Sequence, residues 1–434
     1  MPLSPHRLFP FAQTALKWGG LGALVGTLAG VASAVFLHAL AWATATRLAN
    51  PWLIAFLPLA GLAVGWGYWR FGGRASQGNN LVIDEVNRDQ ERIPLRMAPL
   101  VLVGTIVTHL FGGSAGREGT AIQMGASLAD SVRRILPIPP ADRRLLIMAG
   151  IAGGFGSVFG VPAAGFIFGM EVQTVGRVRY EGLIPCLVAA YTGDWVTRAL
   201  GAPHSHYPAM PVVGMDGWLV AKVGLAGLIC GLVSMVFVEL VHAIKEIWRW
   251  QRVWPPLQPV LGGVVVVVLA AVVGSPDYLG LSLPLIQKSV DGTGVVAGAF
   301  ALKLLFTAVT LGCGYQGGEV TPLLVMGATL GFTLGRVLGV DPAFMASIGL
   351  VAVFAGASNT PLASAVMGIE LVGGGAALYL FLGCALAYFA SGHRGIYNTQ
   401  SIGSAKAVGA DVQEGENLRE LATRRRGDEG GISP

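Results

Sequence analysis

Charged side chains are scarce in this chain. Asp, Glu, Lys and Arg make up only 12% of its 434 residues, whereas an ordinary soluble domain has about 25%. Hydrophobic residues make up 53%, and so few charges would leave a large apolar surface in contact with water. The shortage of charge therefore excludes most soluble proteins.

Cysteine is also scarce, and each of the four lies in an apolar or glycine-rich run: Cys186, Cys230, Cys313 and Cys384. We interpret them as small packing residues, neither disulfides nor metal ligands. The net charge of +5 comes from loops and the tail, so the basic soluble domain that nucleic-acid binding requires is missing. The apolar run near the N-terminus is too long for a cleavable signal peptide. We expect no metal, no cofactor and no nucleic-acid partner.

Apolar runs fill most of the sequence, and some reach the roughly 20 residues needed to cross a bilayer. Others are too short for a simple crossing, and the chain contains 63 glycines, which permit close backbone approach and broken helices. Transporters use such half-helices to point helix ends at a substrate. Basic clusters typical of cytoplasmic loops lie at 70–96, 133–144, 245–252 and 424–426. The pattern predicts an all-α, multi-pass membrane protein.

An internal repeat divides the chain. GREGTAIQMGASL at 116–128 matches GEVTPLLVMGATL at 318–330 with an offset of 202, and PAAGFIFGMEV at 162–172 matches PLASAVMGIEL at 361–371 with an offset of 199. Two matches in the same order predict two related halves, whose interface holds the substrate site. We therefore divide the chain into an N-terminal segment, two membrane repeats and a polar tail: 1–13, 14–205, 206–397 and 398–434.

The first candidate site is the start of a helix after GGSAGREGT at 112–120. Unpaired amides and the helix dipole form an anion site at such an end, and we expect the amides of Gly119, Thr120 and Ala121 to be free. A carboxylate in a bilayer costs about 2.5–3.5 kcal/mol or more. Glu118 is therefore either functional or held in an ion pair with Arg117, and the residues alone leave both readings open.

The second half repeats this device in GGEVTP at 317–322. Thr321 offers a hydroxyl, Pro322 suits a first helical turn, and Glu319 is a second carboxylate in such a place. Glu171 and Glu370 occupy equivalent positions in the repeat. We expect both of these to be structural, buried and hydrogen-bonded.

A rival reading comes from the GxSxG pattern at 112–116, with His109 nearby. It would make the chain an intramembrane serine protease with Ser114 as nucleophile. However, Ser114 and His109 share one short segment, the second half has no convincing partner histidine, and the repeat stays unexplained. We keep the protease as a remote alternative.

Three of these motifs together resemble the signatures of the CLC chloride channels and transporters: GREG at 116–119, the glycine-rich copy at 317–322, and PAAGFIFGMEV at 162–172. The resemblance runs from about residue 14 to Tyr397, in the order typical of the family. It implies a CLC-type fold of two inverted-topology repeats and a homodimer in which each subunit has its own anion path. It further implies that Glu118 is the gating, proton-carrying glutamate and that Tyr397 coordinates the inner part of the path.

The departures from the chloride members are equally informative. Thr120 replaces the proline of GREGP, Asn79 stands where the family has a serine-bearing GSGIP motif, and Val172 replaces the internal proton-accepting glutamate. All three changes, with Glu319 beside the central site, are similar to the fluoride branch of the family. With Val172 in that place, Glu319 becomes the candidate inner proton carrier.

The resemblance therefore implies a fluoride/proton antiporter that exports fluoride, confers fluoride resistance and is not an enzyme. Its path would be formed by Asn79, Gly119, Thr120, Thr321 and Tyr397, with Glu118 and Glu319 as the working carboxylates. We expect it as a homodimer in a lipid bilayer, the plasma membrane of a prokaryote. A chloride-type CLC antiporter or channel is the main alternative.

Overall fold

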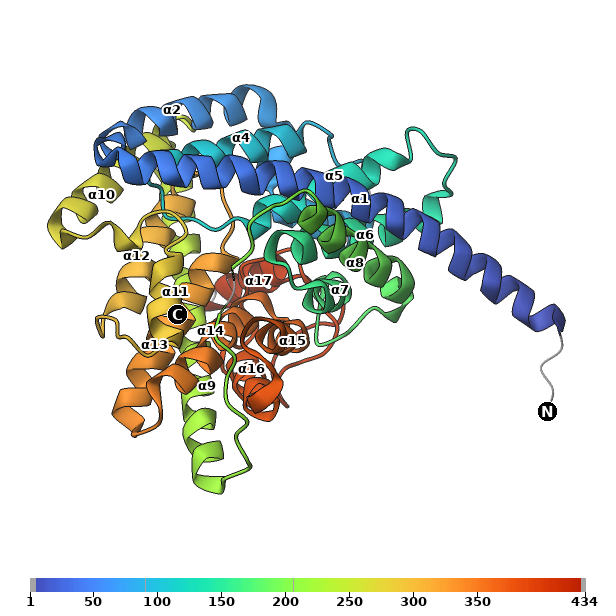
Figure 1. The fold of residues 1–434 in the computed structure, drawn as a ribbon. Coiled ribbons are helices and arrows are strands. Elements are labelled where there is room, and N and C mark those ends of the chain that lie inside the picture. The colour runs from blue at the N-terminus through green and yellow to red at the C-terminus, as the bar shows by residue number, and fades with distance from the viewer. Residues whose placement is uncertain (1–4, 90, 206, 431–434) are drawn as a thin grey trace.

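The computed structural model describes residues 5–89, 91–205 and 207–430 and is predominantly helical (Figure 1). The first half contains α1 (Pro5–Ala49), α2 (Leu57–Gly67), α3 (Asn79–Arg88), α4 (Met97–Leu110), α5 (Glu118–Val132), α6 (Arg143–Phe159), α7 (Pro162–Glu171) and α8 (Leu183–Ala199). The second half contains α9 (Gly217–Trp250), α10 (Leu257–Val273), α11 (Leu283–Val290), α12 (Ala299–Gly312), α13 (Val320–Leu338), α14 (Pro342–Ser358), α15 (Pro361–Val372) and α16 (Ala377–Ala390). Two short strands, β1 (Thr174–Val175) and β2 (Ser401–Ile402), and a last helix, α17 (Leu418–Gly430), accompany them, and short 3-10 and π-helical segments lie between several helices.

Local chemistry sets where several of these helices begin. The Asp216 side chain accepts a hydrogen bond from the amide of Leu219 at 2.8 Å and so caps α9. Asp341 caps α14 in the same way, accepting from Ala343 at 2.9 Å, and Pro342 occupies the first turn. Both caps satisfy amides that would otherwise lack an acceptor.

Helix length agrees with the expected membrane architecture. Among the residues that the structure describes, four helical stretches are long and apolar enough to cross a membrane: residues 12–49, 51–88, 217–250 and 320–338. Several apolar helices, among them α4, α12 and α15, are shorter. The fold therefore combines full crossings with short helices that end inside the protein, as the interrupted apolar runs predict.

Glycine contacts of the same kind join neighbouring helices in each half. A Cβ added to Gly125 on α5 would lie 2.2 Å from the carbonyl oxygen of Gly150 on α6. A Cβ added to Gly327 on α13 would lie 2.0 Å from that of Gly349 on α14. These pairs are related by the two offsets of the sequence repeat, so the repeat reappears as a repeated helix contact.

Helix α1 runs along one side of the molecule and packs against α4, α5, α6 and α8 (Figure 1). Near its start, Lys17 forms an ion pair with Asp142, the residue that precedes α6. Arg143 follows directly and is one of the basic residues expected to be cytoplasmic. The start of α1 and the start of α6 therefore lie on the same side of the membrane.

The C-terminal segment is docked on the helical body. Strand β2 pairs in parallel with β1, with Thr174 opposite Ser401 and Val175 opposite Ile402. Leu418 and Leu421 of α17 pack against Val175 and Ile402, and Glu420 forms an ion pair with Arg88. The polar composition of the tail does not reveal this docking, because only four buried apolar side chains make the cluster.

Candidate functional site

The starts of α5 and α13 meet in the middle of the protein. The amide of Gly116 donates to the carbonyl of Gly318 at 2.6 Å, and the amide of Gly318 donates back to Gly116 at 2.8 Å. This antiparallel bridge places two helix N-termini side by side. Positive dipole ends and unpaired amides therefore converge on one place, where an anion is stabilised.

Glu118 is fully buried, and its carboxylate reaches from α5 to the start of α13. One oxygen accepts from the amide of Thr321 at 3.0 Å and from the amide of Arg117 at 3.1 Å, and the other accepts from the Thr321 hydroxyl. The Arg117 Nε is 3.4 Å from the carboxylate. Glu118 therefore contacts Arg117, as one sequence reading expects, and its carboxylate also lies at the anion-stabilising end of α13.

Gly119 brings Asn79 and Glu319 together. A Cβ on Gly119 would lie 2.8 Å from the Asn79 Nδ2 and 3.6 Å from the Glu319 Oε2. The glycine therefore lets the backbone of α5 fit between these two side chains. Asn79 begins α3, and Glu319 directly precedes α13.

Tyr397 lies beyond the last apolar helix but is almost completely buried. Its ring meets Phe168 edge-on at 6.4 Å between centroids, and Phe168 stacks on Phe155 at 4.2 Å. Thr399 donates to the carbonyl of Asn80 at 2.8 Å, which ties this segment to the start of α3. The structure thus joins the residues that follow Tyr397 to the start of α3, where Asn79 lies.

Four buried polar atoms around this place have no hydrogen-bond partner among the residues that the structure describes: Asn79 Oδ1, Gln123 Oε1, Glu319 Oε2 and Tyr397 Oη. An unsatisfied buried polar group is costly, so such atoms usually mark a site for a proton or a ligand. Gln123 was missed by the sequence analysis. The available signal was a polar side chain in an otherwise apolar helix, and its amide lies 3.4 Å from where a Cβ of Gly78 would be.

Two sequence expectations need correction, those for Ala121 and Glu370, and the contact of a third residue, Thr120, is new. The amide of Ala121 is not free, because it donates to the Arg117 carbonyl at 3.2 Å. The Thr120 hydroxyl shares a hydrogen bond with the Thr105 hydroxyl of α4 at 2.7 Å, so this side chain turns toward α4. Glu370 is exposed, whereas Glu171 is buried as expected.

Glu171 and Glu370 are nevertheless structural in a reciprocal way. Glu171 at the end of α7 accepts from the amides of Leu362 and Ala363 at the start of α15, at 3.1 and 2.8 Å. Glu370 on α15 accepts from the amides of Ala163 and Ala164 at the start of α7, at 2.9 and 2.7 Å. Each carboxylate caps the helix that carries the other.

The geometry gives the protease reading no support. The ring nitrogens of His109 lie 2.8 Å from the carbonyl of Thr105 and 3.0 Å from that of Ala115. The Ser114 hydroxyl pairs with Thr307 at 2.9 Å. Both groups are occupied in holding the loop that precedes Glu118.

A family model described as voltage gated chloride channel matches residues 60–392. The chain belongs to this family, the CLC family. Its members transport ions, and the two converging helix starts lie within the matched region.

Two relatives and one solved structure show how similar the chain is to particular members of this family. The chain is 45% identical over 396 residues to the chloride/fluoride channel protein of Pseudomonas syringae pv. tomato, covering 90% of this chain and 87% of that protein. It is 26% identical over 390 residues to the H(+)/Cl(-) exchange transporter ClcA of Vibrio vulnificus, covering 81% of each. The crystal structure of a CLC-type fluoride/proton antiporter superimposes with a TM-score of 0.86 at 33% identity, covering 89% of this chain and 98% of that one.

Proposed function

We propose that this CLC protein is a fluoride/proton antiporter that exports fluoride in exchange for protons. The observation that carries the proposal is the position of Glu118. Its carboxylate occupies the start of α13, where the Thr321 amide and hydroxyl hold it. A fluoride ion competes for the same donors, and protonation of Glu118 removes the charge that these donors stabilise. One proton and one anion therefore exchange places at a single site.

The chemistry of the surrounding groups suits fluoride. Fluoride is small, hard and strongly hydrated, so a site must replace its water with close donors. The amides near Gly119, the Asn79 amide, the Thr321 hydroxyl and the Tyr397 hydroxyl are donors that carry no full positive charge. They bind the ion without trapping it.

Glu319 is the proposed second proton carrier. Its Oε2 is buried and unpaired, while the residue as a whole keeps some accessible surface. Since Val172 stands where chloride-type exchangers have an internal glutamate, a proton passing inward needs another group. Glu319 precedes α13, close to Gly119, and so lies beside the place that Glu118 occupies.

An outer cavity of about 260 Å³ supports a continuous path. Phe159, His204 and Tyr207 line it, and the Arg117 guanidinium lies 5.9 Å from the centroid of the Phe159 ring. Because Arg117 contacts Glu118, this cavity lies next to the gate. We propose it as the outer approach to Glu118.

The family resemblance and exposed apolar side chains support the proposed assembly and location. We propose a homodimer in the plasma membrane of a prokaryote, each subunit built from halves 14–205 and 206–397 with its own path. Exposed apolar side chains on α8 and α16 include Leu187, Trp195, Phe381 and Phe389. Such surfaces are stable only against lipid or a partner subunit.

The test uses purified protein in liposomes loaded with fluoride, with fluoride and pH electrodes read together. The proposal expects fluoride to leave while protons enter, with little response when chloride replaces fluoride. Rapid chloride exchange without preference for fluoride would favour the chloride-type alternative. No anion movement in folded protein would contradict both.

A further inference from the structure

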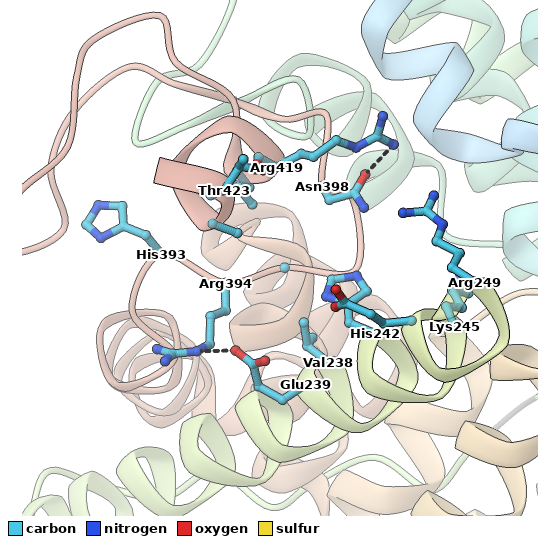
Figure 2. A pocket seen from close by; sticks show the side chains of 14 residues that line it. Val238, Glu239, His242, Lys245, Arg249, His393, Arg394, Asn398, Arg419 and Thr423 are labelled. Atoms are coloured by element: carbon cyan, nitrogen blue, oxygen red, sulfur yellow. Dashed lines mark hydrogen bonds and ion pairs between the residues drawn. The ribbon is translucent and has the colours of Figure 1, made fainter. Parts of the chain in front are cut away.

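A cavity of about 220 Å³ lies between α9 and the C-terminal segment (Figure 2). Two of its lining residues, Gly395 and Asn398, flank Tyr397 in the chain. A third, Lys245 on α9, is the charged side chain that acts most strongly on Glu319. The cavity therefore adjoins the Tyr397 end of the proposed path.

This end of the path faces the cytoplasm. Lys245 belongs to the basic cluster at 245–252, and Arg88 at the end of α3 pairs with Glu420 of α17. Basic clusters of this kind mark the cytoplasmic side. The C-terminal segment and the cavity therefore lie where cytoplasmic anions enter.

Helix α17 forms the wall of this cavity opposite α9. The amide of Arg419 donates to the Asn398 carbonyl at 2.8 Å, and the amide of Leu418 donates to the Gln400 carbonyl at 3.1 Å. These bonds join the first turn of α17 to the residues that directly follow Tyr397. The wall is thus held in a defined place relative to the path.

The wall carries positive charge toward the opening. Figure 2 shows Arg249 reaching from α9 toward Asn398, while Arg419 reaches toward the same place from α17. Arg419 is 3.4 Å from the Asn398 Oδ1, and within the described part of the chain neither arginine is in ion-pair distance of a carboxylate. By contrast, Arg394 is neutralised by Glu239 at 2.5 Å. The lining as a whole carries Lys245, Arg249, Arg394 and Arg419 against Glu239 and Glu246, so positive charge is in excess at the opening.

We propose that the C-terminal helix α17 is a wall of the inner mouth and that Arg419, together with Arg249, recruits a small inorganic anion to it. This inference rests on the proposed transport function, in which the anion is cytoplasmic fluoride. Both arginines are exposed, so they raise the local anion concentration and do not bind one ion tightly. Charges that line an opening act in this way on the rate of entry, and salt weakens their effect.

The test uses inverted membrane vesicles from cells that produce the full chain, because their cytoplasmic face is outward. Fluoride added to the medium then reaches the inner mouth directly, and fluoride and pH electrodes follow its uptake. Vesicles without the protein give the background. For Arg419→Gln and Arg249→Gln, we expect the fluoride concentration at half-maximal rate to rise about threefold to fivefold. The maximal rate and the proton-to-fluoride ratio stay unchanged.

Three further variants separate charge from structure. Arg419→Lys keeps the charge and should behave as wild type, and Thr423→Arg adds a charge to the same wall and should lower the half-saturating concentration. Arg336→Gln, at the far end of α13, is the matched control and should change nothing. Added salt of impermeant ions should reduce the difference between wild type and Arg419→Gln.

Several results would overturn the inference. They are an unchanged half-saturating concentration in Arg419→Gln, an Arg419→Lys variant no better than Arg419→Gln, or faster transport in Arg419→Gln, which would make α17 a plug. If Arg419→Gln does not fold, an unchanged half-saturating concentration in Thr423→Arg would overturn the inference in its place. Wild-type vesicles that move no fluoride would contradict the proposed function itself, and the inference would fall with it.

Discussion

The starts of α5 and α13 share a backbone geometry but carry opposite charges. Each follows a glycine of the Gly116–Gly318 bridge, and the residue that precedes the helix is Arg117 in one case and Glu319 in the other. Helix α5 begins with Glu118, whereas the equivalent residue of α13 is Val320, which Thr321 follows. The repeat therefore supplies two equivalent helix N-termini that stabilise an anion. The side chains differ, so that α5 carries the Glu118 carboxylate and α13 provides the Thr321 amide and hydroxyl that bind it.

The packing around these starts shows no such difference. The Gly125–Gly150 and Gly327–Gly349 contacts are equally tight, and Glu171 and Glu370 cap each other's helices. The scaffold therefore keeps the symmetry of the repeat, while the proposed transport chemistry depends on the side chains that break it. Four predictions follow this division from the largest expected effect to the smallest.

The largest effect is expected for Glu319, the carboxylate whose counterpart in the first repeat is Arg117. Glu319→Gln should reduce coupled proton movement at least about a hundredfold, because an amide cannot carry a proton, a contribution typical of positioned acid–base groups. Fluoride and pH electrodes on liposomes measure it. Glu181→Gln, which changes a carboxylate that pairs with Arg144 and Arg179 away from the path, should keep the coupling. Coupling retained in Glu319→Gln would remove this residue from the mechanism.

The two equivalent glycine contacts, Gly125–Gly150 and Gly327–Gly349, should be equally sensitive to substitution. Gly125→Ala and Gly327→Ala each force a methyl group into a backbone carbonyl, so each should destabilise the fold by roughly 3 kcal/mol. Thermal unfolding of purified protein in detergent, followed by size-exclusion chromatography, checks this. Gly19→Ala is the control, since a Cβ there meets nothing within 4 Å. A large difference in thermal stability between the two variants would show that the two halves do not pack their helices in the same way.

The contact between Thr321 and Glu118 can be tested by removing the Thr321 hydroxyl. Thr321→Val removes the hydroxyl that donates to Glu118 and keeps the shape of the side chain. A hydrogen bond to a charged group contributes about 1.5–3 kcal/mol, so the transport rate should change by about tenfold or more. Thr321→Ser restores the donor and should restore most of the wild-type rate. Equal rates in all three proteins would contradict the contact.

The smallest expected effect is on the docked C-terminal segment. Burial lowers the pKa of Lys406 from 10.5 to about 7, and burial with the charges of Lys406 and Arg425 lowers the pKa of His393 from 6.5 to about 4. In both cases the undocked segment binds more protons, so docking weakens as pH falls from 10.5 to 7 and again from 6.5 to 4.

Amide hydrogen exchange of Ile402 and Leu418, corrected for intrinsic rates, reports this docking. Protection should be severalfold lower at about pH 6 than at about pH 9. Lys406→Met should flatten the dependence above neutral pH, since no proton is then bound there. Amide-exchange protection that rises as the pH falls would contradict the expected direction of this pH dependence.

The sequence predicted the architecture because its signals are local: apolar runs, broken helices, and a repeat whose offsets bring Glu118 and Thr321 to matching helix starts. It could not predict where side chains turn. Thr120 has the right residue type, yet its hydroxyl pairs with Thr105. Gln123 reads as a tolerated polar residue until its unsatisfied oxygen is seen beside the path. The docking of α17 depends on a few long-range backbone bonds that leave no periodic pattern.

In the proposed mechanism, Glu118 carries the proton and competes with fluoride for the start of α13. Its most direct test is the Glu118→Gln variant in fluoride-loaded liposomes, with both electrodes read together and Glu181→Gln as the control. We expect proton entry driven by the fluoride gradient to disappear in Glu118→Gln and to persist in the control. Proton entry at the wild-type ratio to fluoride in Glu118→Gln would contradict the account.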